Sequence, residues 1–541
     1  MTWDYIIIGA GSAGCVLANR LSADPSVRVL LIEAGGADWS PYIHIPAAII
    51  RAVGNPGLDW CHLAEPDPSR GNKVDLWPAG RVLGGSSSIN GMLFVRGAPH
   101  DYDGWASLGN AGWAYADVLP YFKRMESFVG GDQQYRGVDG PLCVSHLRSV
   151  HPLAEVFVKA SQEQGIPYNA DYNGVSQGGV SFPQVTQKRG WRFSASRAYL
   201  WPARRRKNLR IETRSVCSRL LFEAGQCIGA EFSRSGQTQV AHASRRVILA
   251  CGAIGTPKIL MLSGIGPAGA LQRHGISVVK NAPEVGANLM EHPEAMVSID
   301  VNVSTYNTEI SSPRIVKHLA NWLLFGRGPA TSPYPHSVAF IKSHQGLSHP
   351  DLQIMLGPYA FSFSEAGIVP YGKPAVSAAI NPSYPQSRGT VALRSAQPSD
   401  KPIISHALLS STDDIQRLIA GGRKMREVFH SPAFDRYRVG ERLPGPGIQT
   451  DDEWTDYLRK TAFLGYHPTG TCRMGADAGA VVAPDLQVRG VRGLSIADAS
   501  IFPTLISGNT NAGVMMVAER AADLILSQDR MANAGVGVRV P

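Results

Sequence analysis

One histidine near the C-terminal end of the sequence lies in a setting that suits proton transfer. His467 is followed by Pro468, which disfavours a helical conformation for the preceding residue and so fixes the direction of the imidazole ring. Phe463, Leu464 and Met474 flank this Gly/Thr/Pro-rich loop and offer an apolar floor that would exclude water. Histidine is the commonest general base because its pKa is near neutral. Since the chain has 15 histidines, the setting and not the residue type favours His467.

A glycine-rich loop at the N-terminus predicts a nucleotide-binding turn. The apolar run 4–8 is typical of a buried parallel strand, and residues 15–21 have helical spacing. Between them, Gly9 would allow a tight turn, Gly11 would let the backbone approach a pyrophosphate, and Gly14 would let the helix pack on the strand. The free N–H groups at the start of the helix would then face the phosphates.

A carboxylate at the end of the next strand indicates which nucleotides this loop could bind. The apolar run 29–32 ends at Glu33, about 20 residues beyond the loop, where a dinucleotide fold requires an acid. Glu33 would accept hydrogen bonds from the ribose hydroxyls, and its charge disfavours a 2′-phosphate, which makes NADP an unfavourable ligand. The unit alone leaves NAD and FAD open.

Length and charge restrict the class of protein. With 541 residues, the chain is too long for one core, which predicts two domains in an α/β protein. The net charge of +9 could indicate an anionic partner, but the densest basic run is only Arg204–Lys207 and has no aromatic platform for bases. We therefore expect no nucleic-acid partner and interpret this run as a solvated turn, with contact to anionic lipid as the lesser alternative.

Other kinds of site find little support. The seven cysteines are odd in number and contain no C-x-x-C pair, which argues against a disulfide framework and a zinc site. His44 and His62 have no ligand-spaced partner, so no metal is expected, and Ser86–Ser88 lack the G-x-S-x-G elbow of a hydrolase. A strand begins by residue 4, which leaves no room for a signal peptide, and no apolar run reaches transmembrane length. The expected location is the cytoplasm, with a peripheral position at the inner membrane as the alternative.

Five ordered motifs together carry a family resemblance. Besides the N-terminal loop, they are the stretches 78–97 (PAGRVLGGSSSINGMLFVRG), 252–266 (GAIGTPKILMLSGIG), 285–293 (VGANLMEHP) and the C-terminal pair 467–475 and 498–511. The chain resembles the glucose–methanol–choline (GMC) oxidoreductases over nearly its whole length, and within them the choline-dehydrogenase-like and bacterial alcohol-dehydrogenase-like enzymes. Met290 and Glu291 depart from the Gln and Asp that are commoner in that family.

The resemblance implies FAD as the cofactor. It places Asn90 and Gly91 beside the isoalloxazine ring, the Cys217 backbone at the adenine, Asp498 and Ala499 at the ribityl–diphosphate side, and Asn509 with Thr510 at the pyrimidine edge. Ile89 stands where some relatives carry a His that bonds the flavin, so a non-covalent cofactor is expected. The full set of residues predicted to bind FAD is Gly9, Gly11, Ser12, Ala13, Gly14, Glu33, Ala34, Arg81, Val82, Gly85, Ser86, Asn90, Gly91, Met92, Leu93, Cys217, Ala250, Gly252, Tyr466, Asp498, Ala499, Asn509 and Thr510.

The resemblance also gives His467 a partner. It places His467 over the reactive face of the flavin and Asn511 at the second position of a His–Asn pair. An amide cannot act as a base, but it can donate to an alkoxide as charge develops. The alternative for Asn511 is a helix N-cap, because residues 512–519 begin a helical pattern.

The motifs divide the chain into interleaved segments. We expect a Rossmann-like FAD-binding domain formed by residues 1–45, 78–100, 205–300 and 465–527. An α+β substrate-binding domain with flavin-covering segments would take 46–77, 101–204 and 301–464, and residues 528–541 would form a frayed tail. Aromatic residues of 301–464 could shape an apolar pocket, but the sequence leaves open which of them do so: Tyr306, Trp322, Phe325, Tyr334, His336, Tyr359, Phe361 and Phe363.

These features predict the oxidation of a primary alcohol to an aldehyde, with a hydride passing to flavin N5 and the hydroxyl proton to His467. The partners would be a small-molecule alcohol and an electron acceptor. By resemblance alone, a dehydrogenase with a quinone-like acceptor is favoured over an oxidase that uses O2. A non-redox, FAD-containing hydroxynitrile lyase-like enzyme is the alternative from another class. The oligomeric state stays open.

Overall fold

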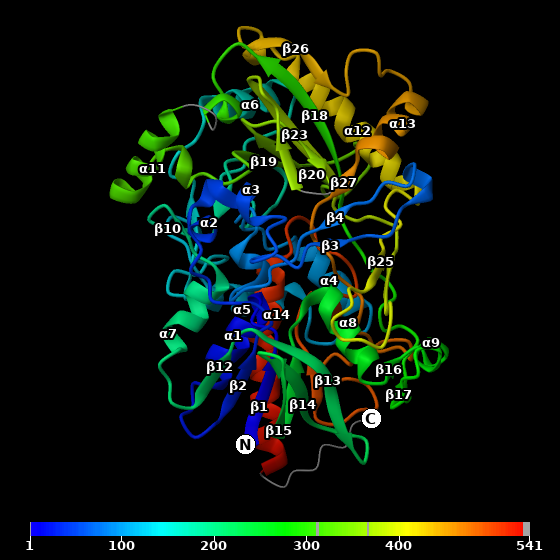
Figure 1. The fold of residues 1–541 in the computed structure, drawn as a ribbon. Helices are drawn as coiled ribbons and strands as arrows, with labels where there is room; N and C mark the ends of the chain where they lie inside the picture. The colour runs from blue at the N-terminus through cyan, green and yellow to red at the C-terminus, as the bar shows by residue number, and fades with distance from the viewer. Residues whose placement is uncertain (1, 310–312, 365–366, 534–541) are drawn as a thin grey trace.

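The computed structural model describes residues 2–309, 313–364 and 367–533. It contains two large sheets, one above the other in Figure 1, each with its own apolar core. The lower sheet carries the N-terminal motif and the upper sheet is formed mainly by the middle of the chain. This arrangement confirms the α/β class and the pairing of a Rossmann-like layer with an α+β layer.

The lower sheet begins with the predicted strand–loop–helix unit. Its strands, in spatial order, are β12 (Leu209–Glu212), β2 (Val29–Ile32), β1 (Thr2–Ile8), β15 (Gln237–Leu249), β14 (Gln226–Arg234) and β13 (Ser215–Glu223), and β28 (Leu494–Ile496) also pairs with β15. The pairs β12–β2, β2–β1, β1–β15 and β15–β28 are parallel, while β13, β14 and β15 form an antiparallel meander. Every residue of β2 is buried, as expected for a strand covered on both faces.

Helices α1 (Ser12–Leu21) and α14 (Asn511–Asn533) pack together beside this sheet, and α14 runs through its layer in Figure 1. Helices α4 (Pro99–Ser107) and α5 (Tyr115–Met125) join them, and α8 (Gly252–Leu262) follows β15. The tail expected from residue 528 is instead helical to Asn533, and residues 534–541 lie outside the described residues.

The upper sheet is antiparallel and holds strands from four separate parts of the chain. Its order is β26 (Arg438–Leu443), β18 (Pro293–Val301), β23 (Ala375–Pro382), β20 (Leu352–Gly357), β19 (Ser337–Ile341) and β8 (Gly179–Ser181), with β27 (Phe463–Leu464) also paired to β18. Helices α6 (Pro152–Glu163), α12 (Thr412–Phe429) and α13 (Asp451–Thr461) supply side chains to its core.

Two segments belong to a different layer from the one expected from the sequence. Residues 293–300 form β18 of the upper sheet, although they follow directly on a cofactor motif. Conversely, α4 and α5 belong to the lower core, because Trp105 and Phe122 are fully buried there. Burial of large aromatic side chains places α4 and α5 in the lower layer, and strand pairing places β18 in the upper sheet. Cofactor motifs in the sequence carry no information about aromatic burial or strand pairing.

Several short elements and one longer helix lie between or beside the two layers. They include α2 (Pro41–His44), α3 (Ile49–Ala52), the pairs β3–β4 (His62–Leu63 and Leu76–Trp77) and β10–β11 (Gln187–Lys188 and Trp191–Arg192), α7 (Trp201–Ala203), and α11 (Arg314–Phe325), which projects from the side of the molecule in Figure 1. Within the described ranges, no helix combines the length and the apolar character needed to cross a bilayer.

Candidate active site

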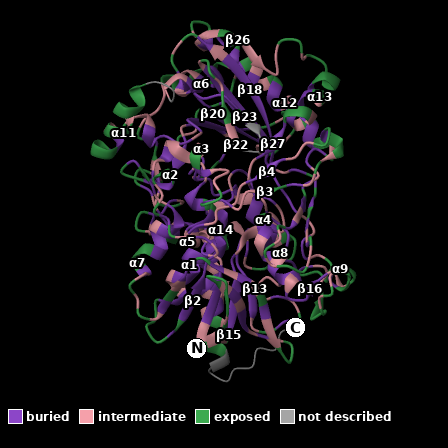
Figure 2. Cartoon of the chain, in the orientation of Figure 1, coloured by how far each residue is buried: buried purple, intermediate pink, exposed green. Residues whose placement is uncertain are grey.

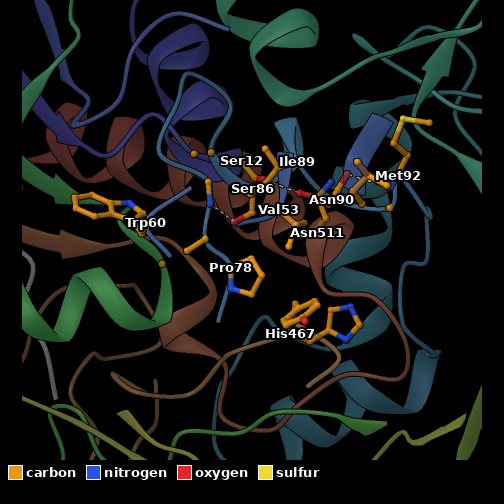
Figure 3. Close-up of a pocket in the computed structure, with 18 of the residues that line it drawn as sticks. Ser12, Val53, Trp60, Pro78, Ser86, Ile89, Asn90, Met92, His467 and Asn511 are labelled. Carbon is orange, nitrogen blue, oxygen red and sulfur yellow. Dashed lines mark hydrogen bonds between the residues drawn. The ribbon is translucent and has the colours of Figure 1, made fainter. Parts of the chain in front are cut away.

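A cavity of about 760 Å³ lies where the two layers meet. The ends of β1 and β2 contribute Ile8 and Ile32 to its wall, and the upper sheet contributes Glu294 of β18 and Met355 of β20. Figure 3 shows that residues from distant parts of the chain, among them Ser12, Asn90 and His467, meet around this one space. A ligand in the cavity would therefore contact both layers.

Most of the residues predicted from the sequence line this cavity. The lining set includes Gly9, Gly11, Ser12, Ala13, Glu33, Ala34, Gly85, Ser86, Asn90, Gly91, Met92, Leu93, Cys217, Ala250, Gly252, Tyr466, His467, Asp498, Ala499, Asn509, Thr510 and Asn511. Segments from both ends of the chain and from its middle thus converge on one space. A ligand that fills this space would contact all of these segments.

Three predicted residues are not among those that line the cavity. A Cβ at Gly14 would come within 1.8 Å of the Gly9 carbonyl oxygen, so Gly14 serves the close packing of α1 on the strand loop, as its spacing predicts. Val82 is buried in an apolar cluster that includes Ile89. The Arg81 guanidinium stacks 4.9 Å above the Trp60 ring. Neither of the latter two side chains forms part of the lining.

The nucleotide end of the cavity has the donors and the acceptor that an adenosine diphosphate needs. Helix α1 starts with no side-chain cap and no acidic residue in its first turn, so its first N–H groups and its positive dipole end are available to phosphate. Glu33 accepts from the backbone N–H groups of Ala10 (2.8 Å) and Gly35 (2.7 Å) through different carboxylate oxygens. Burial raises the pKa of Glu33 to about 6, and these two bonds oppose the shift, so the group is ionised at neutral pH and can accept further bonds from ribose hydroxyls.

The second glycine stretch closes against the first. Gly85 has a φ of +53°, and a Cβ there would meet the Gly11 Cα at 2.6 Å, so the two loops touch backbone to backbone. Ser86 is exposed to the cavity while its neighbours Ser87 and Ser88 are buried and bonded to backbone carbonyls. This cradle fits a phosphate-bearing cofactor such as FAD.

We expect Gly85→Ala to lose most of its bound FAD, because the added methyl group must separate the two loops. The matched control is Gly71→Ala, since Gly71 also has a positive φ (+69°) but a Cβ at that position would have no atom within 4 Å. Both variants carry backbone strain of about 1–2 kcal/mol. The FAD released by denaturation of the purified proteins measures the difference. Equal FAD content in the two variants would contradict the hypothesis that the close contact of the two loops is needed to bind FAD.

The Asp498 side chain joins two parts of the cavity wall. Its carboxylate accepts from the N–H groups of Gly252 (2.9 Å) and Ser500 (2.8 Å) and from the hydroxyls of Thr256 and Ser500 (2.6 Å each). All four bonds come from the protein, so this side chain holds the start of α8 beside the segment that begins at Ala499. Its predicted contact with the cofactor would come from its backbone.

The loop with His467 is paired to the 285–293 motif. Met290 and Thr469 exchange two backbone bonds (3.0 and 3.1 Å), and the Gly465 N–H donates to the His292 carbonyl at 2.9 Å. The carboxylate of Glu291 receives the N–H groups of both His467 and His292. Two motifs far apart in the sequence therefore form one rigid unit.

A chain of hydrogen bonds fixes the tautomer of His467. His292 Nε2 lies 3.1 Å from the Ser383 carbonyl, which only accepts, so we assign the proton of His292 to Nε2 and a lone pair to its Nδ1. That Nδ1 lies 2.9 Å from His467 Nδ1, which must then be the donor. The lone pair of His467 is consequently on Nε2, where the Asn509 amide Nδ2 donates to it at 2.9 Å.

Burial keeps both histidines neutral. It lowers the pKa of His292 to about 4, so its Nδ1 remains an acceptor above that pH. Burial, with a smaller contribution from the nearby His292, places the pKa of His467 well below its usual value. The His467 ring is thus unprotonated across the neutral range.

The two asparagines take different positions. Asn509, predicted for the edge of the flavin, is the residue bonded to His467. Asn511 lies in the same cavity, but its Oδ1 accepts from Ser12 Oγ at 2.6 Å, at the first residue of α14. The role of Asn511 beside His467 stays a prediction. The Asn511 side chain binds Ser12 of α1, and this contact is separate from the capping of α14.

No sequence pattern predicts the polar residues that lie behind Asn509. Gln353 Nε2 donates to Asn509 Oδ1 (3.0 Å), and Asn381 Nδ2 donates to both Gln353 Oε1 (3.2 Å) and Glu294 Oε1 (3.3 Å). Burial raises the pKa of Glu294 to about 8, so this carboxyl in the cavity wall is neutral at pH 7. Gln353, Asn381 and Glu294 lie on three strands of the upper sheet, and no local pattern marks them. His292, in contrast, lies within the 285–293 motif, and this motif could have marked it as a site residue.

The far end of the cavity is apolar. Of the aromatic residues left open by the sequence, those that line it are Tyr306, Tyr334, His336, Tyr359 and Phe361. Trp322 is buried against Trp191 and Phe325 is exposed, while the side chain of Phe363 lies outside the described residues. In the described part of the chain, no group of three or more His, Cys, Asp or Glu residues is placed to hold a metal ion.

Two family models match the chain, and both are described as GMC oxidoreductase, over residues 3–294 and 385–518. The chain belongs to the GMC oxidoreductase family. Among its relatives, an alcohol dehydrogenase [acceptor] from Pseudomonas putida is 41% identical over 99% of this chain and 98% of its own. An oxygen-dependent choline dehydrogenase from Sinorhizobium medicae is 42% identical over 99% and 97%.

Solved structures agree with this membership of the GMC family. Pyridoxine 4-oxidase from Mesorbium loti matches with a TM-score of 0.88 at 30% identity, covering 96% of this chain and 99% of its own. Formate oxidase from Aspergillus oryzae matches with 0.90 at 25%, covering 98% and 99%. The chain is therefore an oxidoreductase of the family that acts on CH–OH groups, and the family implies FAD.

Proposed function

We propose that this GMC oxidoreductase oxidises a neutral primary alcohol to the aldehyde, with His467 as the base. The observation that carries the proposal is the hydrogen-bond chain Ser383–His292–His467, which leaves the His467 Nε2 lone pair facing the cavity. An alcohol O–H that donates to Nε2 takes the place of the Asn509 amide there. The freed amide N–H can then stabilise the oxygen as negative charge develops on it.

The cofactor would be FAD held without a covalent bond. Bound FAD supplies the acceptor for the carbon-bound hydride. Ile89 lines the cavity at the position where a nucleophile would be needed for attachment, and an alkyl side chain has none. The thiol of Cys217, also in the wall, is kept neutral by burial, which raises its pKa to about 12. Both residues favour a cofactor that denaturation releases.

The wall beyond His467 favours an alcohol with an apolar or aromatic body. Tyr334, Met355, Tyr359, Phe361 and Phe463 belong to one apolar cluster that lines this end. The neutral Glu294 adds no charge at pH 7. The Pseudomonas putida relative is named as a dehydrogenase and not as an oxidase, and on that resemblance we propose a dehydrogenase with a quinone-like acceptor ahead of an oxidase that uses O2.

A cationic alcohol is the second candidate. The relative from Sinorhizobium medicae is named for choline, and Glu294 is a cavity carboxyl that a bound cation would ionise. A non-redox lyase that keeps FAD would use the same His467 and is the candidate from another class.

Anaerobic mixing of the purified holoenzyme with a panel of alcohols separates these candidates. We expect alkyl and aryl primary alcohols to bleach the visible absorbance of the flavin, and choline to do so at least about tenfold more slowly. Repeating the reaction with O2 and with a soluble quinone identifies the acceptor. Faster bleaching by choline would assign the cationic substrate, and cyanohydrin cleavage without bleaching by any alcohol would assign the lyase.

A further inference from the structure

Helix α11 exposes a row of apolar side chains to solvent. Of its 12 residues, Trp322 is the buried one, whereas Val316, Leu323, Leu324 and Phe325 are each between 63% and 70% exposed. Figure 2 shows α11 as an exposed projection at the side of the molecule. Soluble proteins rarely leave so many neighbouring large apolar side chains uncovered unless something binds them.

The exposure is built into the fold, because the inner face of α11 is firmly attached. The Trp322 indole N–H donates to the Gly190 carbonyl at 2.8 Å, and its ring packs 4.1 Å from that of Trp191. At the C-terminal end of the helix, Arg148 Nε donates to the Gly326 carbonyl at 2.7 Å. These contacts orient the apolar row outward.

Cations surround the apolar row. Arg314 and Lys317 lie on the helix, and Arg327 follows it. Exposed Arg148 and Arg189 lie at its C-terminal end, where both segments touch Gly326. The nearby carboxylate Glu309 is already bonded to His318 and paired with Arg314. The rim of this surface is therefore strongly positive.

A series of side-chain contacts connects α11 to the basic turn after α7. From Trp191, the His44 ring lies at 6.3 Å, and His44 Nε2 lies 3.3 Å from Arg197 Nη2. Arg197 and Arg204 both stack on Trp201, at 4.7 and 3.1 Å. In Figure 1, α11, β10 and α7 follow one another along one side of the molecule, and the basic run Arg204–Lys207 directly follows α7 there. We call this surface the α11–α7 band.

The band also borders an opening of the cavity. Ile315, His318 and Leu319 of α11 line the cavity, as do Tyr42 of α2 and Arg51 of α3. All of these except His318 are also exposed to solvent, so this is where the cavity meets the exterior. Whatever covers the apolar row would lie over this opening.

We propose that the α11–α7 band docks on an anionic lipid bilayer, with the apolar row of α11 inserted at the headgroup–acyl boundary. Apolar residues within a cationic rim are the pattern that binds such a surface, and a helix of this length can lie in the interface but cannot span it. A second copy of the chain fits worse, because a two-fold interface would bring two positive rims together. With the band docked, the cavity opening would face the bilayer and could receive lipid-soluble molecules directly from it.

The test is flotation of the holoenzyme with vesicles of phosphatidylcholine, with and without phosphatidylglycerol. We expect binding that requires phosphatidylglycerol and weakens with salt. The variant Val316→Ser/Leu323→Ser/Leu324→Ser should lower the vesicle partition coefficient at least about tenfold, and Arg205→Gln/Lys207→Gln several-fold. The matched control is Val129→Ser/Val175→Ser/Val439→Ser, three residues that are at least as exposed as Leu323 and are not part of the band, and this variant should bind as the wild type.

FAD content and turnover of a short soluble alcohol without vesicles should be unchanged in the α11 variant, since its three residues do not line the cavity. Unchanged vesicle binding by this variant, or no binding by the wild type, would overturn the proposal. A wild-type dimer that the variant converts to a monomer in light scattering, without vesicle binding, would instead assign the surface to a second copy. Binding is measured independently of activity, so failure of the proposed reaction would leave this test intact.

Discussion

His467→Ala is expected to retain FAD but to lose about 10²–10⁴-fold in the rate of flavin reduction by alcohol. The substitution removes the cavity's proton acceptor at Nε2 and leaves His292 Nδ1 and the Asn509 amide without their partner. The residues that cradle the nucleotide lie elsewhere, at α1, Glu33 and Gly85, so FAD content should be close to that of the wild type. Anaerobic rapid mixing measures the rate directly.

The matched control for this experiment is His62→Ala. His62 is also 7% exposed and also lines the cavity, where it stacks on Trp60, but it is not part of the His292–His467 chain. We expect its rate of flavin reduction to stay within about tenfold of the wild type. A near-wild-type rate in His467→Ala would reject His467 as the base, whereas equal losses in both variants would indicate that any truncation of this wall disturbs the cavity.

The features that the sequence predicted are those that local physics specifies. The glycines of the first loop are demanded by backbone geometry, and Glu33 by its place at the end of a strand, so spacing alone located both. The family resemblance then located the other cofactor segments, and nearly all the predicted residues line one cavity.

The features that could not be predicted depend on tertiary contacts. Gln353 and Asn381 lie on separate strands of the upper sheet, and their significance arises only because β20 and β23 are neighbours there. The exposure of α11 likewise cannot be read from its amphipathic pattern. The same pattern would serve a buried helix, and only the fold shows that Trp322 is the one fully buried residue of α11.

The second large effect is expected at His292, which acts through His467. His292→Phe removes the acceptor of the His467 Nδ1–H, so the buried ring is no longer held with its lone pair on Nε2. We expect the rate constant for flavin reduction to fall on the order of 10²-fold, with little change in FAD content. His292→Asn is the conservative variant, because its Oδ1 can occupy the position of the lost Nδ1 and accept the same proton.

Recovery in His292→Asn to within about tenfold of the wild type would identify tautomer control as the role of His292, while equal losses in both variants would assign it to packing. The pH profile gives a second readout. A base is active in its deprotonated form, so activity is present above the pKa of His467 and is lost as pH falls through it. Because burial keeps that pKa well below 6.5, the wild-type reaction should remain fast at pH 6.5. An acid limb centred at or above pH 6.5 would mean that the working base is a solvated histidine, and the buried Ser383–His292–His467 chain would then not be the catalytic unit.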